Sequence, residues 1–183
     1  MITNIIFILM ILSALILDLK SNKIPNYITF TGTIIGIILY IISDGFSGLA
    51  GGALGMLIGI GLLLIPFMMR GIGGGDVKLL GAIGAFKGAQ FVFNTFLASA
   101  IFGGLIALVI IIYKRKIIET LKWCFMGLYK IFAFVVTRGR MRIPLMDFPA
   151  KGIKYPYGLA ISLGAFLILG LEVIQWEGYI LGG

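Results

Sequence analysis

Long apolar segments recur along the whole chain, and they limit it to folds that are built inside a membrane. The 183 residues are 60% hydrophobic and 12% charged, with a mean hydropathy of +1.13. A soluble domain of this length carries far more charge, and a helix needs about 20 apolar residues to cross a bilayer. We therefore expect an all-α, polytopic membrane protein that forms one domain over residues 1–183.

About six transmembrane helices fit the hydropathy pattern: residues 2–17, 27–43, 46–69, a segment that starts near 76, 91–113 and 156–175. No basic residue precedes residues 2–17, so we expect a retained first span and not a cleaved signal peptide. The fourth segment is short, because residues 76–87 rise about 16 Å against a bilayer core of about 30 Å. Either its helix continues past Lys87 to about Phe93, or the preceding glycines are re-entrant and place Asp76 within the membrane. We favour the second.

The basic residues predict how the chain is oriented. Nearly all of them fall in the first, third and fifth loops, and Lys87 alone lies on the opposite side. The positive-inside rule then places these loops in the cytoplasm and both termini outside. Because the positive charge serves orientation, we expect no nucleic-acid partner. Apolar residues at three-four spacing in the fifth loop predict an amphipathic helix on the cytoplasmic interface: Ile118, Leu121, Phe125, Leu128, Phe132 and Val135.

Two aspartates lie at span boundaries on the same predicted side. Asp18 follows the first apolar segment, and Asp76 follows the run Gly73-Gly74-Gly75. Acids are costly near a bilayer, and paired carboxyls can divide the roles of general acid and general base. Asp18 could instead be an ordinary boundary residue, and Asp76 a helix cap. The three glycines favour function, because bare backbone lets an extended peptide approach closely.

Three segments together resemble the prepilin peptidases, a family of integral-membrane aspartyl proteases. The first is Gly73-Gly74-Gly75-Asp76-Val77-Lys78-Leu79, which is similar to the family's GxGD motif. The second is Asp18 followed by Lys20 and Ile24-Pro25-Asn26. The third, Tyr155-Pro156-Tyr157-Gly158, resembles a signature at the last span, although Leu159 stands where many members have a proline. Order, spacing and hydropathy agree over essentially the whole chain.

The resemblance implies an aspartic endopeptidase that cleaves the leader peptide of type IV prepilins, pseudopilins or preflagellins at the cytoplasmic membrane face. Asp18 and Asp76 would activate a water by general acid/base catalysis. The implied substrate-binding residues are Gly73, Gly74, Gly75, Lys20, Lys78, Pro25 and Asn26. The expected partners are a substrate with a cytoplasmic leader and an apolar helix, and the lipid bilayer.

We expect no cofactor and no metal, since the chain has no histidine and only one cysteine, Cys124. Larger members of the family that also N-methylate their product carry a cytoplasmic region with cysteine pairs. This chain lacks that region, so methyltransferase activity is not expected.

Two other functions stay open at this stage. A small ion- or proton-coupled transporter could use Asp18 and Asp76 as its binding site. A structural subunit of a secretion machine would need neither acid. For a peptidase, helix dipoles favour Asp76 as the base and Asp18 as the acid, because Asp76 begins a helix and Asp18 ends one.

Overall fold

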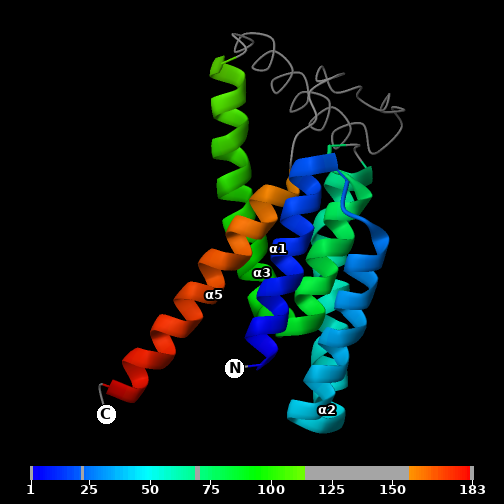
Figure 1. Ribbon diagram of the computed structural model, residues 1–183, viewed down its shortest axis with the longest axis vertical. Coiled ribbons are helices and arrows are strands. Elements are labelled where there is room, and N and C mark those ends of the chain that lie inside the picture. The colour runs from blue at the N-terminus through cyan, green and yellow to red at the C-terminus, as the bar shows by residue number, and fades with distance from the viewer. Residues whose placement is uncertain (1, 22, 69–70, 114–156, 182–183) are drawn as a thin grey trace, which may run out of the picture.

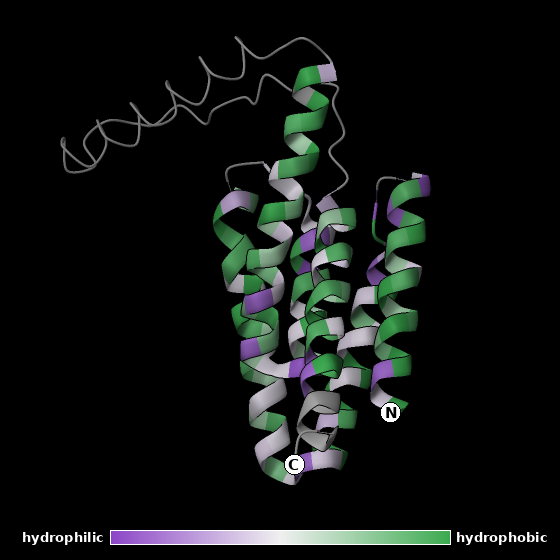
Figure 2. Ribbon diagram, turned by 90° about the vertical axis from the view of Figure 1, so that its left-hand side faces the viewer, coloured by the Kyte–Doolittle hydropathy of each residue, from purple (hydrophilic) through white to green (hydrophobic). Residues whose placement is uncertain are grey.

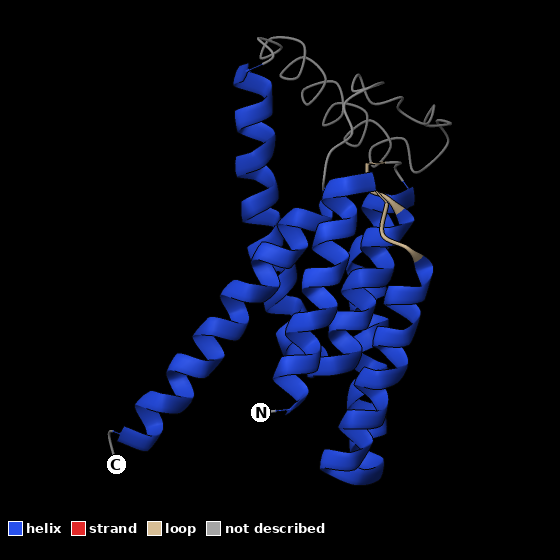
Figure 3. Ribbon diagram, viewed as in Figure 1, coloured by secondary structure: helices blue, strands red, loops and turns tan. Residues whose placement is uncertain are grey.

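The computed structural model describes residues 2–21, 23–68, 71–113 and 157–181, and its ordered elements are all helices. They are α1 (Ile2–Ser21), α2 (Asn26–Met68), α3 (Gly74–Tyr113) and α5 (Tyr157–Leu181) (Figure 1). Only helices and short connections occur in this part of the chain (Figure 3), which confirms the predicted all-α class. The predicted amphipathic helix of the fifth loop lies outside the described residues.

Two glycines divide α2 and α3 into pairs of arms that fold back on each other. Gly45 has φ 63° and ψ −137°, and Gly88 has φ 79° and ψ −177°. This left-handed backbone is accessible to glycine without the steric penalty of a side chain. The resulting arms, 26–44 with 46–68 and 74–87 with 89–113, lie close to the predicted second to fifth apolar segments. The break at Gly88 also shows that the expected alternative of a helix running straight past Lys87 is wrong.

Four described helices are long and apolar enough to cross a membrane: Ile2–Ser21, Asn26–Met68, Gly74–Ile110 and Tyr157–Gln175. The predicted count of six spans is therefore not confirmed, although α2 and α3 each turn back at an internal glycine. Apolar residues cover much of the helical surface (Figure 2), and many large ones are exposed, among them Phe30, Ile42, Phe46 and Ile65. Such a surface suits contact with lipid.

The second arm of α2 packs directly against the first arm of α3, backbone to backbone. Gly55 lies against the carbonyl of Gly84, and a Cβ added at Gly59 would lie 2.5 Å from the carbonyl oxygen of Leu80. Small residues on one stripe let helices approach this closely in lipid. The glycine repeat of this segment therefore fixes the position of the arm that begins with Asp76.

The connections that carry the site gather at one end of the helical bundle. Residues 23–26, residues 71–74 and the start of α5 share this end, whereas the start of α1, the C-terminal end of α5 and the fold-back in α2 lie at the other (Figure 1). The first and third loops, which the basic residues placed on one side of the membrane, therefore lie at the same end of the bundle. The side of the membrane that each end faces stays a prediction.

Lys87 joins α3 to α5 at the end remote from the site. Its Nζ lies 2.7 Å from Glu172 Oε2, and its side chain is only 11% exposed. The same Nζ lies 6.0 Å and 5.4 Å from the ring centroids of Phe7 and Phe91. The one basic residue predicted on the far side thus has a local role in holding α1, α3 and α5 together.

Candidate active site

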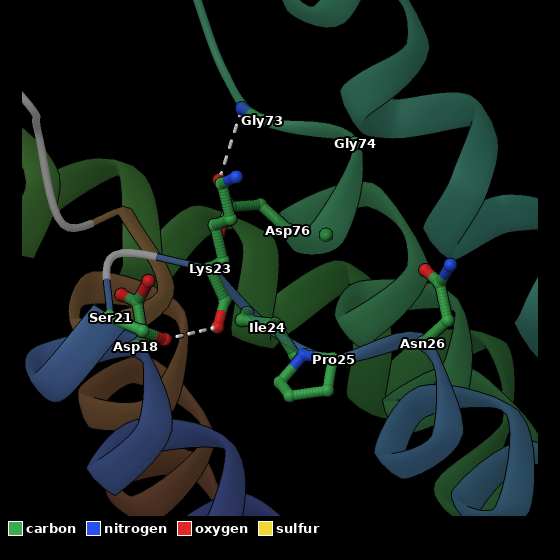
Figure 4. Close-up of a pocket in the computed structure, with 10 residues that line it drawn as sticks. Asp18, Ser21, Lys23, Ile24, Pro25, Asn26, Gly73, Gly74 and Asp76 are labelled. Carbon is green, nitrogen blue, oxygen red and sulfur yellow. Dashed lines mark hydrogen bonds between the residues drawn. The ribbon is translucent and has the colours of Figure 1, made fainter.

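Asp18 and Asp76 line one cavity at the loop end of the bundle. Asp18 lies in the last turns of α1 and Asp76 in the first turn of α3, and both are buried, at 5% and 8% exposure. The cavity measures about 570 Å³ and is lined by residues of three segments: Asp18, Ser21, Lys23, Ile24, Pro25, Asn26, Gly73, Gly74, Gly75 and Asp76 (Figure 4). Both carboxyls belong to the lining of this single cavity. Two acids that are 58 positions apart in the sequence therefore form one local pair.

The backbone of the glycine run holds the Asp76 carboxyl in place. The Gly73 N–H donates a hydrogen bond to Asp76 Oδ2 at 3.1 Å, and the Asp76 N–H donates one to the Gly73 carbonyl at 3.1 Å. Asp76 thus caps its own helix, as the alternative interpretation of this residue expected. Capping and chemistry are compatible here, because the cap is also what aims the carboxyl into the cavity.

The segment between α1 and α2 covers part of the glycine run. A Cβ added at Gly75 would lie 3.2 Å from the Cβ of Ile24 and 3.4 Å from its carbonyl oxygen. Residues 23–26 run between Asp18 and the glycines in the view of Figure 4. All three glycines line the cavity, and at Gly75 the chain itself, through Ile24, lies against the backbone that was predicted to receive a substrate.

The predicted substrate-binding residues divide into two groups. Pro25 and Asn26 line the cavity with the three glycines, whereas Lys20 and Lys78 are exposed and do not line it. Lys78 Nζ donates a hydrogen bond of 2.9 Å to Asn26 Oδ1. This bond ties the start of α3 to the start of α2, so Lys78 acts on the rim of the cavity and not within it.

Sequence reasoning did not include the first turn of α5 among the site residues. A Cβ added at Gly158 would lie 2.6 Å from Asp18 Oδ2 and 2.8 Å from Asp18 Cγ. The Tyr157-Gly158 signature marked this turn, but only as a resemblance. Periodicity and spacing contain nothing that places α5 against α1.

This contact also weakens the dipole argument for the roles of the two acids. Asp18 was expected to lie at the end of the first helix alone. In the structure α1 continues to Ser21, and Asp18 faces the first turn of α5 as well. Both carboxyls therefore lie at a helix N-terminus, and the dipoles no longer distinguish an acid from a base.

Fold and site together define a helical membrane protein with two buried carboxyls in a cavity that is lined by glycine backbone. The model of the type IV leader peptidase family matches residues 5–108, a range that contains both aspartates and the glycine run. The chain belongs to the type IV leader peptidase family. No curated protein and no solved structure matched it.

Membership in this family implies a peptidase of the inner membrane with prepilin-type substrates. It does not favour the transporter alternative. The part of the chain outside the matched range includes α5, so the contact between Gly158 and Asp18 is known from the structure alone.

Proposed function

We propose that this chain is an aspartic endopeptidase that removes the leader peptide of type IV prepilins, pseudopilins or preflagellins. The observation that carries the proposal is the burial of Asp18 and Asp76 in one glycine-lined cavity within the segment that matches the family. The grouping of basic residues in the first, third and fifth loops of the sequence supports a cytoplasmic active site with both termini outside.

The proposed reaction uses a water held between the two carboxyls. One carboxylate takes a proton from the water, whose oxygen attacks the scissile carbonyl carbon. The other carboxyl is protonated, and it donates a hydrogen bond to the carbonyl oxygen as negative charge develops there. When the tetrahedral intermediate collapses, the C–N bond breaks and the leaving amine receives a proton from the pair. The two acids titrate as a unit, so the roles belong to the pair.

The proposed substrate binds as an extended strand along the glycine run. The backbone of the three glycines lines the cavity, and main-chain pairing holds an extended peptide whatever its side chains. The apolar helix that follows the leader would then continue into the bilayer beside the bundle. Among the described residues, the two aspartates are the only acidic side chains that line the cavity, so we infer that leader recognition depends on shape and main chain. The reaction requires no cofactor and no metal, and it includes no methyl transfer.

Co-expression with a prepilin tests the proposal. Asp18→Asn and Asp76→Asn should each abolish leader removal in a gel-shift assay, a loss of at least about 100-fold for an acid/base residue. Asp44→Asn is the matched control, because Asp44 is exposed beside the fold-back glycine of α2. If either site variant is present in the membrane at the wild-type amount and still cleaves the prepilin, the two-carboxyl mechanism is refuted. A transporter would process no prepilin in any version, and a structural subunit would keep its partners without both acids.

A further inference from the structure

The first turn of α5 forms a wall of the cavity behind Asp18. A Cβ added at Gly158 would meet Asp18 Oδ2 at 2.6 Å, Asp18 Cγ at 2.8 Å and Ile24 Cδ1 at 3.1 Å. Asp18 Oδ2 is buried and has no hydrogen-bond partner within the described part of the chain. The Asp18 carboxyl therefore sits in the space that a side chain at position 158 would fill.

Other contacts keep this turn of α5 in a fixed place. Ser162 Oγ donates a buried hydrogen bond of 2.8 Å to the Gly158 carbonyl. Six residues after Gly158, a Cβ added at Gly164 would lie 2.8 Å from the Ser99 backbone nitrogen and 2.9 Å from the Thr95 carbonyl oxygen. The tight contact between α5 and the second arm of α3 thus fixes where Gly158 meets Asp18.

We propose that Gly158 is a positioning residue for the catalytic pair, because its missing side chain lets the Asp18 carboxyl reach the geometry that it shares with Asp76. This inference rests on the proposed peptidase function and extends it to α5. Gly158 contacts no substrate in this role. It acts through Asp18.

The contacts decide what an added methyl group would do. At Gly158 the atoms in the way are the ends of two side chains, and these can turn aside without moving a helix. The fold should therefore tolerate Gly158→Ala, while the Asp18 carboxyl turns away from the cavity. At Gly164 the atoms in the way belong to the backbone, so Gly164→Ala must push α5 from α3. At Gly170, on the same helix, nothing lies within 4 Å of an added Cβ.

Three alanine variants of the full chain in detergent separate positioning from packing. For Gly158→Ala we expect a Tm close to that of the wild type and a kcat that is lower by about 10–100-fold, since a misplacement of about 1 Å can reduce a rate by about 100-fold. KM should stay unchanged, because the lost interaction is one made in the transition state. The pH profile of kcat should also move, since the pair that titrates has changed. Gly164→Ala should lower Tm, and any fall in its kcat should accompany that loss of stability, because moving α5 from α3 also shifts the turn that carries Gly158. Gly170→Ala should resemble the wild type.

A wild-type kcat for Gly158→Ala would overturn the inference. So would a fall in kcat that, for each degree of lost Tm, is no larger in Gly158→Ala than in Gly164→Ala. If Gly158→Ala does not accumulate in the membrane, the double variant with Asp18→Ala decides. Removing the Asp18 carboxyl should restore accumulation, and failure to do so would also overturn the inference. Cleavage that survives Asp18→Asn defeats the proposed function itself. Loss of cleavage in Asp18→Asn with full activity in Gly158→Ala defeats only the role of Gly158.

Discussion

Gly59→Ala should destabilise the fold by forcing apart the two arms that hold Asp76. The added Cβ would lie 2.5 Å from the Leu80 carbonyl oxygen, about 0.9 Å short of an ordinary contact at 3.4 Å. Both groups are attached to helix backbone, so the arms themselves must separate. Overpacking of this kind costs about 1–3 kcal/mol. For a chain of this size each kcal/mol lowers Tm by about 2–4 °C, so we expect the overpacking alone to lower Tm by about 2–12 °C.

Gly61→Ala isolates this packing effect. Gly61 lies in the same arm of α2 and has nothing within 4 Å of an added Cβ. Both alanines raise helix propensity by about 0.5–1 kcal/mol, so the difference in Tm between the two variants measures packing alone. Thermal unfolding of the purified protein, followed by circular dichroism at 222 nm, gives both values. Equal Tm values would show that the backbone contact between Gly59 and Leu80 is not as tight as the structure has it.

Two further predictions concern the polar links at the two ends of the bundle. Lys87→Met removes the ion pair with half-exposed Glu172 and should lower stability by about 1 kcal/mol, while leader cleavage at the other end stays within about twofold of the wild type. Gel shift measures the cleavage and thermal unfolding measures Tm. A Lys87→Met variant that loses cleavage while its Tm is unchanged would contradict this prediction. Lys78→Ala and Asn26→Ala should each slow cleavage by about 2–10-fold, because either change breaks a hydrogen bond of about 0.5–1.5 kcal/mol. The double variant should cleave little more slowly than either single variant, because both changes break the same hydrogen bond. If a cleavage time course shows that the two losses add fully, the two residues act independently of that bond.

Much of the fold was predictable because hydropathy and charge agree about where the chain turns. Asp44 precedes Gly45 and Lys87 precedes Gly88, so a polar residue and a glycine mark each fold-back. The number of spans was not predictable in the same way. The arm 74–87 is shorter than a bilayer is thick, and hydropathy cannot show whether such a segment crosses or ends inside.

The candidate site was predictable in its acids but not in its walls. Asp18 and Asp76 could be recognised because a carboxyl near a bilayer is energetically costly and usually has a function. The contact of Ile24 with Gly75 depends on the path of a short connection, and the contact of Gly158 with Asp18 depends on how α5 is rotated. In lipid every face of a helix can be apolar, so the pattern of residues does not indicate which face turns inward.

The wall that Gly158 provides has a consequence for the biogenesis of the protein. During synthesis α1 and α3 enter the membrane well before α5. A growing chain therefore contains both aspartates before the wall of their cavity that α5 provides has formed. If the last helix sets the alignment of the pair, proteolytic competence arises only when α5 has inserted. A nascent chain stalled before residue 157 and presented with a prepilin should then leave it uncut, and processing by such a chain would show that the aspartates align on their own.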